Sequence, residues 1–409
     1  MHCITFILLS LTPSFLFSVA ALPVERYSTI QQFVLILIYI INLGIPVYYG
    51  GLFGRSCGMV MGVWAWANGL KMAVWLFCMP QEERRKRPFF GTLFYWRERA
   101  NKPKKSIDVV KPEDKQKLQE PSKDHSTTNK LDLYYALTSY LRDHLIFETL
   151  DMILLWIDGH QKSIVVFEQA VRMLVFQGPT VSMGWSEILS SFILCTLFSI
   201  HLQLQLQVTY SSFVLIFSIA YKFLPFLGIK TKRMQTVKGY LEEASTMAPA
   251  FESPWEATSL RDYWSNRWHQ FYNSCFVRLT FLPLRRLCGN FKVLRRIIPV
   301  WGVFALSGLM HEYFLICTTG PRTYFYGGAA GWQMLFFLLQ PIGIQMGDAI
   351  FRPGWPGRTF AIGWMIMLSH LFVVPYFLSD YFDVVILRTL PAVLKYLDTY
   401  RTALVGNIF

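Results

Sequence analysis

The chain has 409 residues, of which 53% are hydrophobic and only 16% are charged, whereas an ordinary soluble domain carries about 25% charged residues. Its apolar residues stand in runs long enough to span a bilayer, so we expect an all-α polytopic membrane protein rather than two or three soluble domains. The net charge of +13 comes from Lys and Arg between those runs. No basic helix face or zinc spacing is present that would read a duplex, so no nucleic-acid partner is expected.

About eight apolar runs are predicted to be transmembrane helices. They lie near residues 3–22, 31–53, 57–79, 185–206, 208–228, 297–318, 326–346 and 359–379. The first run has no Lys or Arg before it, and Glu25 and Arg26 follow it, which favours a spanning helix with a lumenal N-terminus. Two runs contain residues unsuited to lipid contact, namely Lys71 in the third run and His201, beside several glutamines, in the fourth.

Composition divides the chain into four parts: transmembrane helices in 1–80, a basic loop in 81–130, the main membrane domain in 131–379 and a C-terminal tail in 380–409. The loop holds 14 Lys and Arg against 8 Asp and Glu, which predicts disorder and a cytosolic location. Two predicted spans separate this loop from a second basic segment at 229–296, so both segments are expected on the same side of the membrane. At the start of the main domain, alternating apolar and charged positions predict amphipathic interfacial helices rather than a span.

His311 is the first candidate for chemistry. It lies with Glu312 deep inside the otherwise uncharged run VWGVFALSGLMHEYFLICTTG, where ionisable groups are costly and are a functional signal by default. Histidine suits general-base work because its ordinary pKa lies near the operating pH. Ser307 is four residues earlier and shares the helix face of His311, whereas Glu312 points about 100° away. The alternative is a histidine that satisfies a hydrogen bond between helices.

The second candidate segment is SLRDYWSNRWHQFY, residues 259–272. Ser259 and Asp262 have the spacing of a capping box, so a helix is predicted to start there. On such a helix Asp262 and His269 lie on one polar stripe, with Trp264 and Trp268 on the adjoining apolar side. Arg261 and Arg267 have the chemistry to pair with phosphates of a cytosolic ligand. An interfacial helix with tryptophan anchors accounts for the same pattern.

The two segments together, SLRDYWSNRWHQ followed some forty residues later by SGLMHE, resemble the wax-synthase-like branch of the membrane-bound O-acyltransferase family. More narrowly, the chain looks like fungal members that acetylate terpenoid and meroterpenoid hydroxyls. The resemblance implies that 131–379 is the catalytic domain, and that the family's histidine is His311 and its second catalytic position His269. It also implies that Arg261, Asp262, Trp264 and Trp268 match the rest of the family motif, whose arginine and tryptophans are structural or donor-site residues. Arg267 is added to the expected donor site for its charge, and Asp262, Ser307 and Glu312 are expected to support the site.

The expected reaction is direct transfer of acetyl from acetyl-CoA to a lipophilic terpenoid alcohol, with the bilayer as a further partner and with no metal or permanently bound cofactor. A wax synthase, joining a fatty acyl group to a long-chain alcohol, is the alternative within the family. Two alternatives lie outside the acyltransferase family: a transporter with a histidine proton relay, and a non-catalytic scaffold. A multi-pass location in the endoplasmic reticulum membrane, with the basic loops cytosolic, is expected.

Overall fold

The computed structural model describes residues 3–21, 29–86, 133–158, 185–227, 232–245, 250–268 and 270–378. Within these ranges the chain forms helices and no strand, as the all-α prediction requires. Most of the predicted basic loop, from 87 onward, lies outside the described residues, as do His269 and the predicted tail at 380–409.

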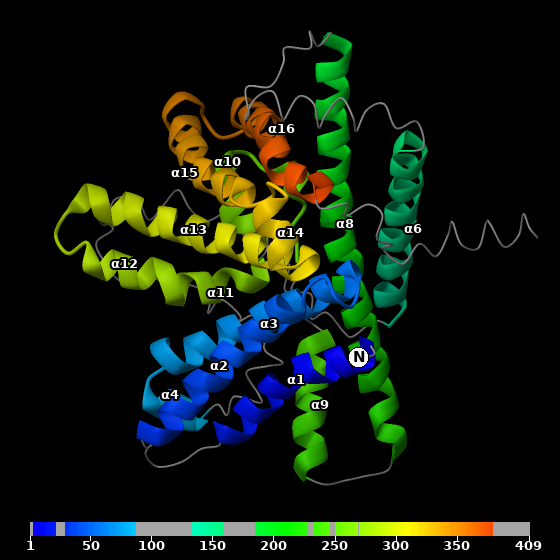
Figure 1. The fold of residues 1–409 in the computed structure, drawn as a ribbon, viewed down its shortest axis with the longest axis vertical. Helices are drawn as coiled ribbons and strands as arrows, with labels where there is room; N and C mark the ends of the chain where they lie inside the picture. Colours follow the sequence, from blue (N-terminus) through cyan, green and yellow to red (C-terminus); the bar gives the residue numbers. More distant parts are fainter. Residues whose placement is uncertain are drawn as a thin grey trace, which may run out of the picture.

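The α-helices, with the labels of Figure 1, are α1 (Cys3–Ala20), α2 (Thr29–Tyr49), α3 (Arg55–Ala73), α4 (Gln81–Lys86), α6 (Leu133–Asp158), α8 (Trp185–Phe223), α9 (Lys232–Ser245), α10 (Leu260–Asp262), α11 (Asn273–Phe276), α12 (Leu282–Leu287), α13 (Lys292–Thr319), α14 (Pro321–Tyr326), α15 (Trp332–Ile350) and α16 (Trp355–Leu378). Short turns of π-helix at Val74–Cys78, Tyr263–Arg267 and Val277–Phe281, and of 3-10 helix at Leu224–Leu227, Pro254–Glu256 and Gln270–Tyr272, continue or join them.

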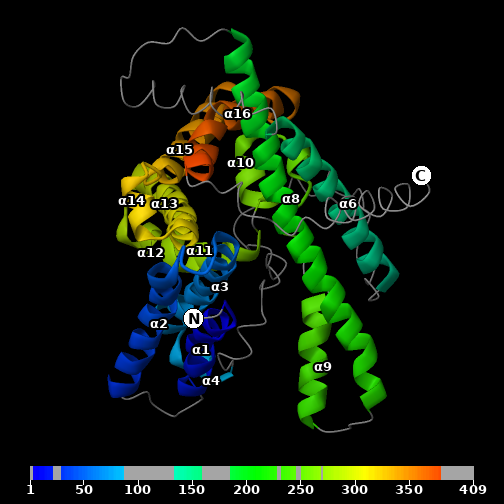
Figure 2. The ribbon, with the colours of Figure 1, turned by 45° about the vertical axis from the view of Figure 1, so that its right-hand side comes forward.

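Two groups of helices meet beside one long helix. Helices α1, α2 and α3 pack together, and α13, α15 and α16 form the second group, with α3 lying against α13 (Figure 1). Helix α8 runs past both groups and contacts α16 and α6. Beyond them, α9 folds back along the last part of α8, and this pair projects away from the other helices (Figure 2).

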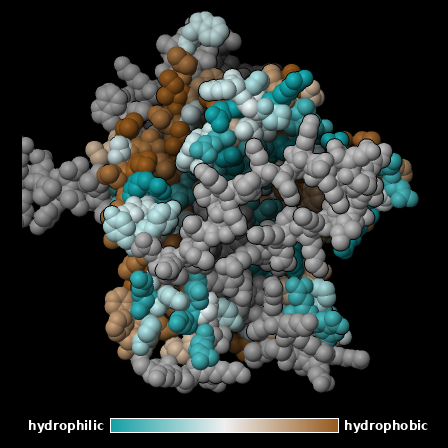
Figure 3. Space-filling view, turned by 180° about the vertical axis from the view of Figure 1, so that it is seen from behind, coloured by the Kyte–Doolittle hydropathy of each residue, from teal (hydrophilic) through white to brown (hydrophobic). Residues whose placement is uncertain are grey.

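Three helices among the described residues are long and apolar enough to cross a membrane: Thr29–Tyr49, Phe192–Phe226 and Lys292–Thr319. Ile4–Ala20 is apolar but shorter. Each of the eight predicted runs overlaps a helix of the described ranges, yet the count of about eight spans is not confirmed. Figure 3 shows hydrophobic side chains gathered along the side where α6 and α8 lie. Ile193 and Ile216 on α8 are more than half exposed there, as expected for a surface that faces lipid.

Helix α8 corrects two of the predicted spans. The runs at 185–206 and 208–228 form a single helix of 39 residues, because no Gly or Pro interrupts it between Trp185 and Phe223. At 1.5 Å per residue it is about 58 Å long, roughly twice the thickness of the hydrocarbon core. The boundary predicted at residue 207, between the two runs, falls inside this helix. The argument that both basic segments lie on one side of the membrane depended on that pair of spans and no longer holds.

Helix α6 does not separate polar from apolar residues as the prediction of an interfacial helix requires, because Phe147 and Leu150 are buried together with its aspartates. The segment predicted as interfacial is one helix that packs along α8, where Asp143 and Asp151 are buried. Asp143 accepts hydrogen bonds from Ser211 and Gln207 of α8 at 2.7 and 3.1 Å. Asp151 lies 3.2 Å from Nε2 of His201. Asp143 and Asp151 therefore hold α6 against α8 instead of facing lipid headgroups.

The close approach of α3 to α13 depends on glycine. A Cβ atom at Gly58 would lie 2.3 Å from the carbonyl oxygen of Cys317, and one at Gly62 would lie 2.8 Å from the Cβ of Cys317. The two glycines are four residues apart on one face of α3, the spacing that lets helix backbones meet in membranes. Because α13 also carries His311, this crossing fixes the position of the candidate site relative to the N-terminal helices.

Gly58→Ala is therefore expected to destabilise the fold by about 1–3 kcal/mol, since the added methyl would overlap a backbone atom that cannot rotate away. The thermal unfolding midpoint in detergent measures this change. Gly363→Ala on α16 is the matched control, because nothing lies within 4 Å of the added Cβ there. Equal midpoints for the two variants would contradict the assigned role of the α3–α13 crossing.

Candidate active site

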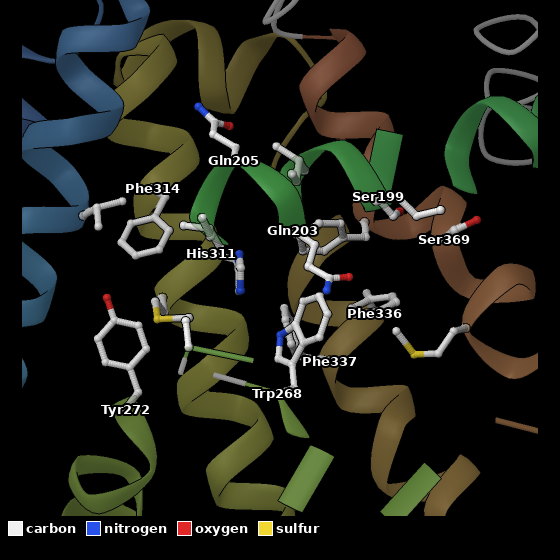
Figure 4. A pocket seen from close by; sticks show the side chains of 18 of the residues that line it. Ser199, Gln203, Gln205, Trp268, Tyr272, His311, Phe314, Phe336, Phe337 and Ser369 are labelled. Atoms are coloured by element: carbon white, nitrogen blue, oxygen red, sulfur yellow. The ribbon is translucent and has the colours of Figure 1, made fainter. Parts of the chain in front are cut away.

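An apolar cavity of about 340 Å³ lies between α8 on one side and α13, α15 and α16 on the other, with the segment around 250–272 along its edge. Most of its lining is aromatic or aliphatic, and His311 is its one lining histidine among the described residues. Figure 4 shows His311 pointing into this space between Phe314 and Phe337. A mostly apolar pocket with a few polar groups is the usual form of a small-molecule site.

The His311 imidazole is held by aromatic rings. It stacks on Phe337 of α15 with ring centres 4.7 Å apart and planes 16° from parallel. The edges of Phe314 and Phe372 approach it at 5.8 and 5.2 Å. The side chain is 7% exposed, and it still reaches the cavity. Aromatic rings from three helices thus fix the plane of the imidazole, and a fixed ring suits the exchange of a proton with a bound molecule.

Glu312, the neighbour of His311, faces away from the cavity. Its carboxylate accepts a hydrogen bond from the Tyr324 hydroxyl at 2.6 Å and another from the backbone N–H of Met334 at 2.8 Å. Met334 is in the first turn of α15, where backbone N–H groups lack partners within the helix. Burial, and then the bond to Glu312, raise the pKa of Tyr324, so its hydroxyl remains a donor. Glu312 thus joins α13 to α14 and α15.

Ser307 and the two tryptophans have different surroundings. Ser307 is buried but does not line the cavity. Trp264 and Trp268 both line it. The indole N–H of Trp264 donates to Gln340 of α15 at 3.2 Å, and Trp268 stacks on Tyr263 at 5.2 Å. The predicted donor-site tryptophans and His311 therefore border one space, although they are more than forty residues apart in the chain.

The predicted helix around residue 260 begins as expected but ends early. Ser259 is the N-cap of α10 and accepts a hydrogen bond from the backbone N–H of Asp262 at 3.1 Å. After Asp262 the chain makes a π-turn, and Trp268 has extended backbone angles. The helix therefore stops at Arg267, before His269, and the single polar stripe predicted from Asp262 to His269 does not form on one helix. The capping pattern could fix the start of the helix but not the π-turn that ends it.

Arg267 holds this segment together. Its guanidinium donates to Asp262 at 2.9 Å and to the carbonyl oxygens of Glu252 and Ser253 at 3.1 and 3.0 Å. Burial raises the pKa of Asp262, but hydrogen bonds, including those from Asn266 and Arg267, outweigh it and leave the pKa below its usual range. Asp262 therefore stabilises the fold at neutral pH, and its contribution is lost as the pH falls through the lowered pKa.

Arg267→Met is expected to lower stability by about 1.5–3 kcal/mol, because it removes a charge-assisted hydrogen bond and leaves two carbonyl groups without their donor. Proteolysis of the 250–268 segment and the unfolding midpoint measure the effect. Arg261→Met is the matched control. Arg261 donates to Asp348 at 2.7 Å, but both side chains are over a third exposed, so its loss should cost less than about 1 kcal/mol. The opposite order of the two effects would contradict this assignment.

Three residues of the site had no place in the sequence-based prediction. Phe337 and Phe372 stack on or border His311, and Gln203 of α8 extends into the cavity (Figure 4). The phenylalanines are indistinguishable from ordinary core residues in an apolar run. Gln203 did leave a signal, since a glutamine in such a run is unsuited to lipid. Within the described ranges, no group of three or more His, Cys, Asp and Glu side chains is placed to hold a metal ion.

The chain is similar to a known protein family in the part that contains both candidate segments. Residues 247–339, which include both candidate segments, match the membrane bound O-acyl transferase family. The probable long-chain-alcohol O-fatty-acyltransferase 8 of Arabidopsis thaliana is 30% identical over 32% of this chain. The long-chain-alcohol O-fatty-acyltransferase of Simmondsia chinensis is 36% identical over 18% of it. The acyl-CoA–sterol O-acyltransferase 1 of Arabidopsis thaliana is 31% identical over 23% of it.

These matches cover 38%, 22% and 25% of the three relatives, so this chain matches well under half the length of each. They support the wax-synthase-like branch that the two motifs predicted. Together with the long apolar helices, they support an integral membrane protein. They do not bear on the narrower resemblance to fungal terpenoid acetyltransferases, which stays a prediction.

Proposed function

We propose that the protein is an acyl-CoA-dependent O-acyltransferase that esterifies a lipophilic alcohol within a membrane. The main observation behind this proposal is that aromatic rings hold the His311 imidazole at the wall of an apolar cavity. The segment that supplies it, with Trp264 and Trp268, is the one that matches the acyltransferase family. A histidine satisfying only a contact between helices would not need to reach a cavity of this kind.

In the proposed reaction, His311 takes the proton of the acceptor hydroxyl as its oxygen attacks the thioester carbonyl carbon. The carbon–sulfur bond then breaks, and the protonated imidazole returns the proton to the thiolate of coenzyme A. His269 is proposed to donate a hydrogen bond to the carbonyl oxygen, where negative charge develops. The transfer is direct, so the mechanism requires no acyl-enzyme.

The donor is proposed to enter by the 250–268 segment. Trp264 and Trp268 line the cavity there, and Arg261 and Arg267 are the proposed contacts for its phosphates. Arg261 is the more available of the two, with 48% of its side chain exposed against 20% for Arg267. Ser307, Asp262 and Glu312 are proposed to support the site through the protein rather than by touching substrate. The basic segments are proposed to face the cytosol from the endoplasmic reticulum membrane, each because of its own content of Lys and Arg.

The acceptor and acyl group are proposed by analogy. The names of the relatives favour a fatty acyl group and a long-chain alcohol, and this is the first candidate. Acetyl transfer to a hydroxylated terpenoid is the second. The cavity volume of about 340 Å³ favours it, because this is near the lower end of the roughly 300–1,000 Å³ of ligand pockets and leaves little room to enclose two long chains.

The test is transfer of a labelled acyl group by the full chain in microsomes. Acetyl-CoA and a long-chain acyl-CoA would each be offered with a long-chain alkanol and with a hydroxylated terpenoid. Ester formed from any of these pairs supports the proposal, and the productive pair selects between the two candidates. A folded protein that forms no ester from any pair would overturn acyl transfer and favour transport or a scaffold.

A further inference from the structure

Helix α8 brings a row of polar side chains to the cavity wall, opposite the aromatic rings of α13 and α15. Ser199, Gln203 and Thr209 belong to this row. The hydroxyls of Ser199 and Thr209 donate to carbonyl oxygens one turn earlier in α8, each at 2.8 Å. On the far wall, Ser369 of α16 likewise donates to Ile366 at 2.6 Å. The donors of these hydroxyls are thus used within their own helices.

Gln203 differs from these residues because its amide makes no hydrogen bond to any described residue. Its side chain points into the cavity beside the Trp268 indole and on the same level as His311 (Figure 4). Two polar neighbours in the HLQLQLQ run, His201 and Gln207, contact aspartates of α6. Gln205 also lines the cavity, but its side chain points away from His311 (Figure 4). The Gln203 amide therefore offers two N–H donors and one carbonyl acceptor to a cavity whose lining is mainly apolar.

An unbonded amide in an apolar pocket is unfavourable for a hydrocarbon ligand. Removing it from water without a partner costs about 1–3 kcal/mol, and an apolar side chain at the same place would bind an alkyl chain better. The amide is compensated when the ligand carries an oxygen that meets it. The reacting hydroxyl cannot be this oxygen, because it must lie against His311 during the proton transfer.

We propose that Gln203 recognises a second oxygen atom, a ketone or hydroxyl, on the acceptor alcohol. The preferred acceptors are then lipophilic alcohols with a second polar group rather than simple alkanols. This inference rests on the acyl transfer proposed above and names the acceptor class of the same site. Gln203 is a specificity-determining residue and takes no part in the transfer of the acyl group.

The experiment compares acceptors in which only the second oxygen varies. The full chain in microsomes receives labelled acyl-CoA with a primary alkanol, or with primary alcohols of the same length that carry a ketone at successive positions. The wild type should prefer one keto-alcohol over the alkanol by about tenfold in kcat/KM, the effect of one hydrogen bond. Gln203→Met, which keeps the length of the side chain and removes its hydrogen bonds, should abolish the preference. It should also raise kcat/KM for the alkanol by about fivefold or more, because the amide that opposes an alkyl chain is gone.

Two further variants complete the test. Gln345→Met, at an exposed position of α15 outside the cavity lining, should retain the preference. Gln203→Asn should retain a preference with its best ketone position moved, because the amide is drawn back toward α8. The same preference in wild type and Gln203→Met would overturn the inference, as would an equal loss with every acceptor or a raised KM for acyl-CoA alone. If the wild type forms no ester at all, the proposed acyl transfer itself fails.

Discussion

His311→Ala is expected to lower kcat for ester formation by about 10²–10⁴-fold, the usual contribution of a general base. No other histidine among the described residues lines the cavity, so no described histidine there can replace it. KM for the acceptor should change little, because the aromatic rings that surround the alcohol remain. The measurement is steady-state transfer in microsomes, with the unfolding midpoint in detergent to confirm that the variant folds.

Two variants separate catalysis from packing. His311→Gln keeps a polar side chain of similar size, so it should restore stability but not activity. His370→Ala removes a second histidine from an apolar helix. His370 meets the edge of Phe192 at 4.3 Å and does not line the cavity, so activity should persist. Activity recovered by His311→Gln, or lost equally in His370→Ala, would assign His311 to packing alone.

The sequence was most informative where a residue was costly for its surroundings. An ionisable pair in an uncharged run identified α13 and its candidate histidine before any contact was known. The capping pattern at Ser259 placed the start of α10 to the residue. Both signals are local: the first depends on the solvent around one helix, and the second on hydrogen bonds within a single turn.

Features that depend on packing between distant segments could not be predicted in this way. His311 and Glu312 look alike in the sequence, yet one points into the cavity and the other toward α14 and α15. Only the position of the neighbouring helices decides between these roles. The continuity of α8 was missed for a similar reason. The polar residues near its middle face either α6 or the cavity, and the sequence alone does not show these neighbours. Glutamine is unfavourable on a helix face that contacts lipid, but it does not interrupt a helix when that face packs against another helix.

Glu312→Ala is expected to destabilise the fold by about 2–5 kcal/mol. It leaves the Tyr324 hydroxyl and the Met334 N–H without their acceptor, each costing about 1–3 kcal/mol, and it opens a cavity beside them. It also removes a negative charge from the N-terminus of α15, where the helix dipole favours one. Denaturant unfolding of the detergent-solubilised protein measures the loss.

The bond between Glu312 and the Met334 N–H should also affect kcat. Phe337 follows Met334 by three residues on α15 and stacks on His311. Glu312→Gln, which can accept from only one of the two donors with its single oxygen, should therefore lower kcat while KM changes less. Tyr324→Phe removes one donor and should cost only about 1 kcal/mol. The double variant of Glu312→Ala and Tyr324→Phe should lose less stability than the sum of the two single losses, since both changes remove the same hydrogen bond. Additive losses would mean that Glu312 and Tyr324 do not share this hydrogen bond. A Glu312→Gln variant with unchanged kcat would mean that Glu312 does not position α15 against His311.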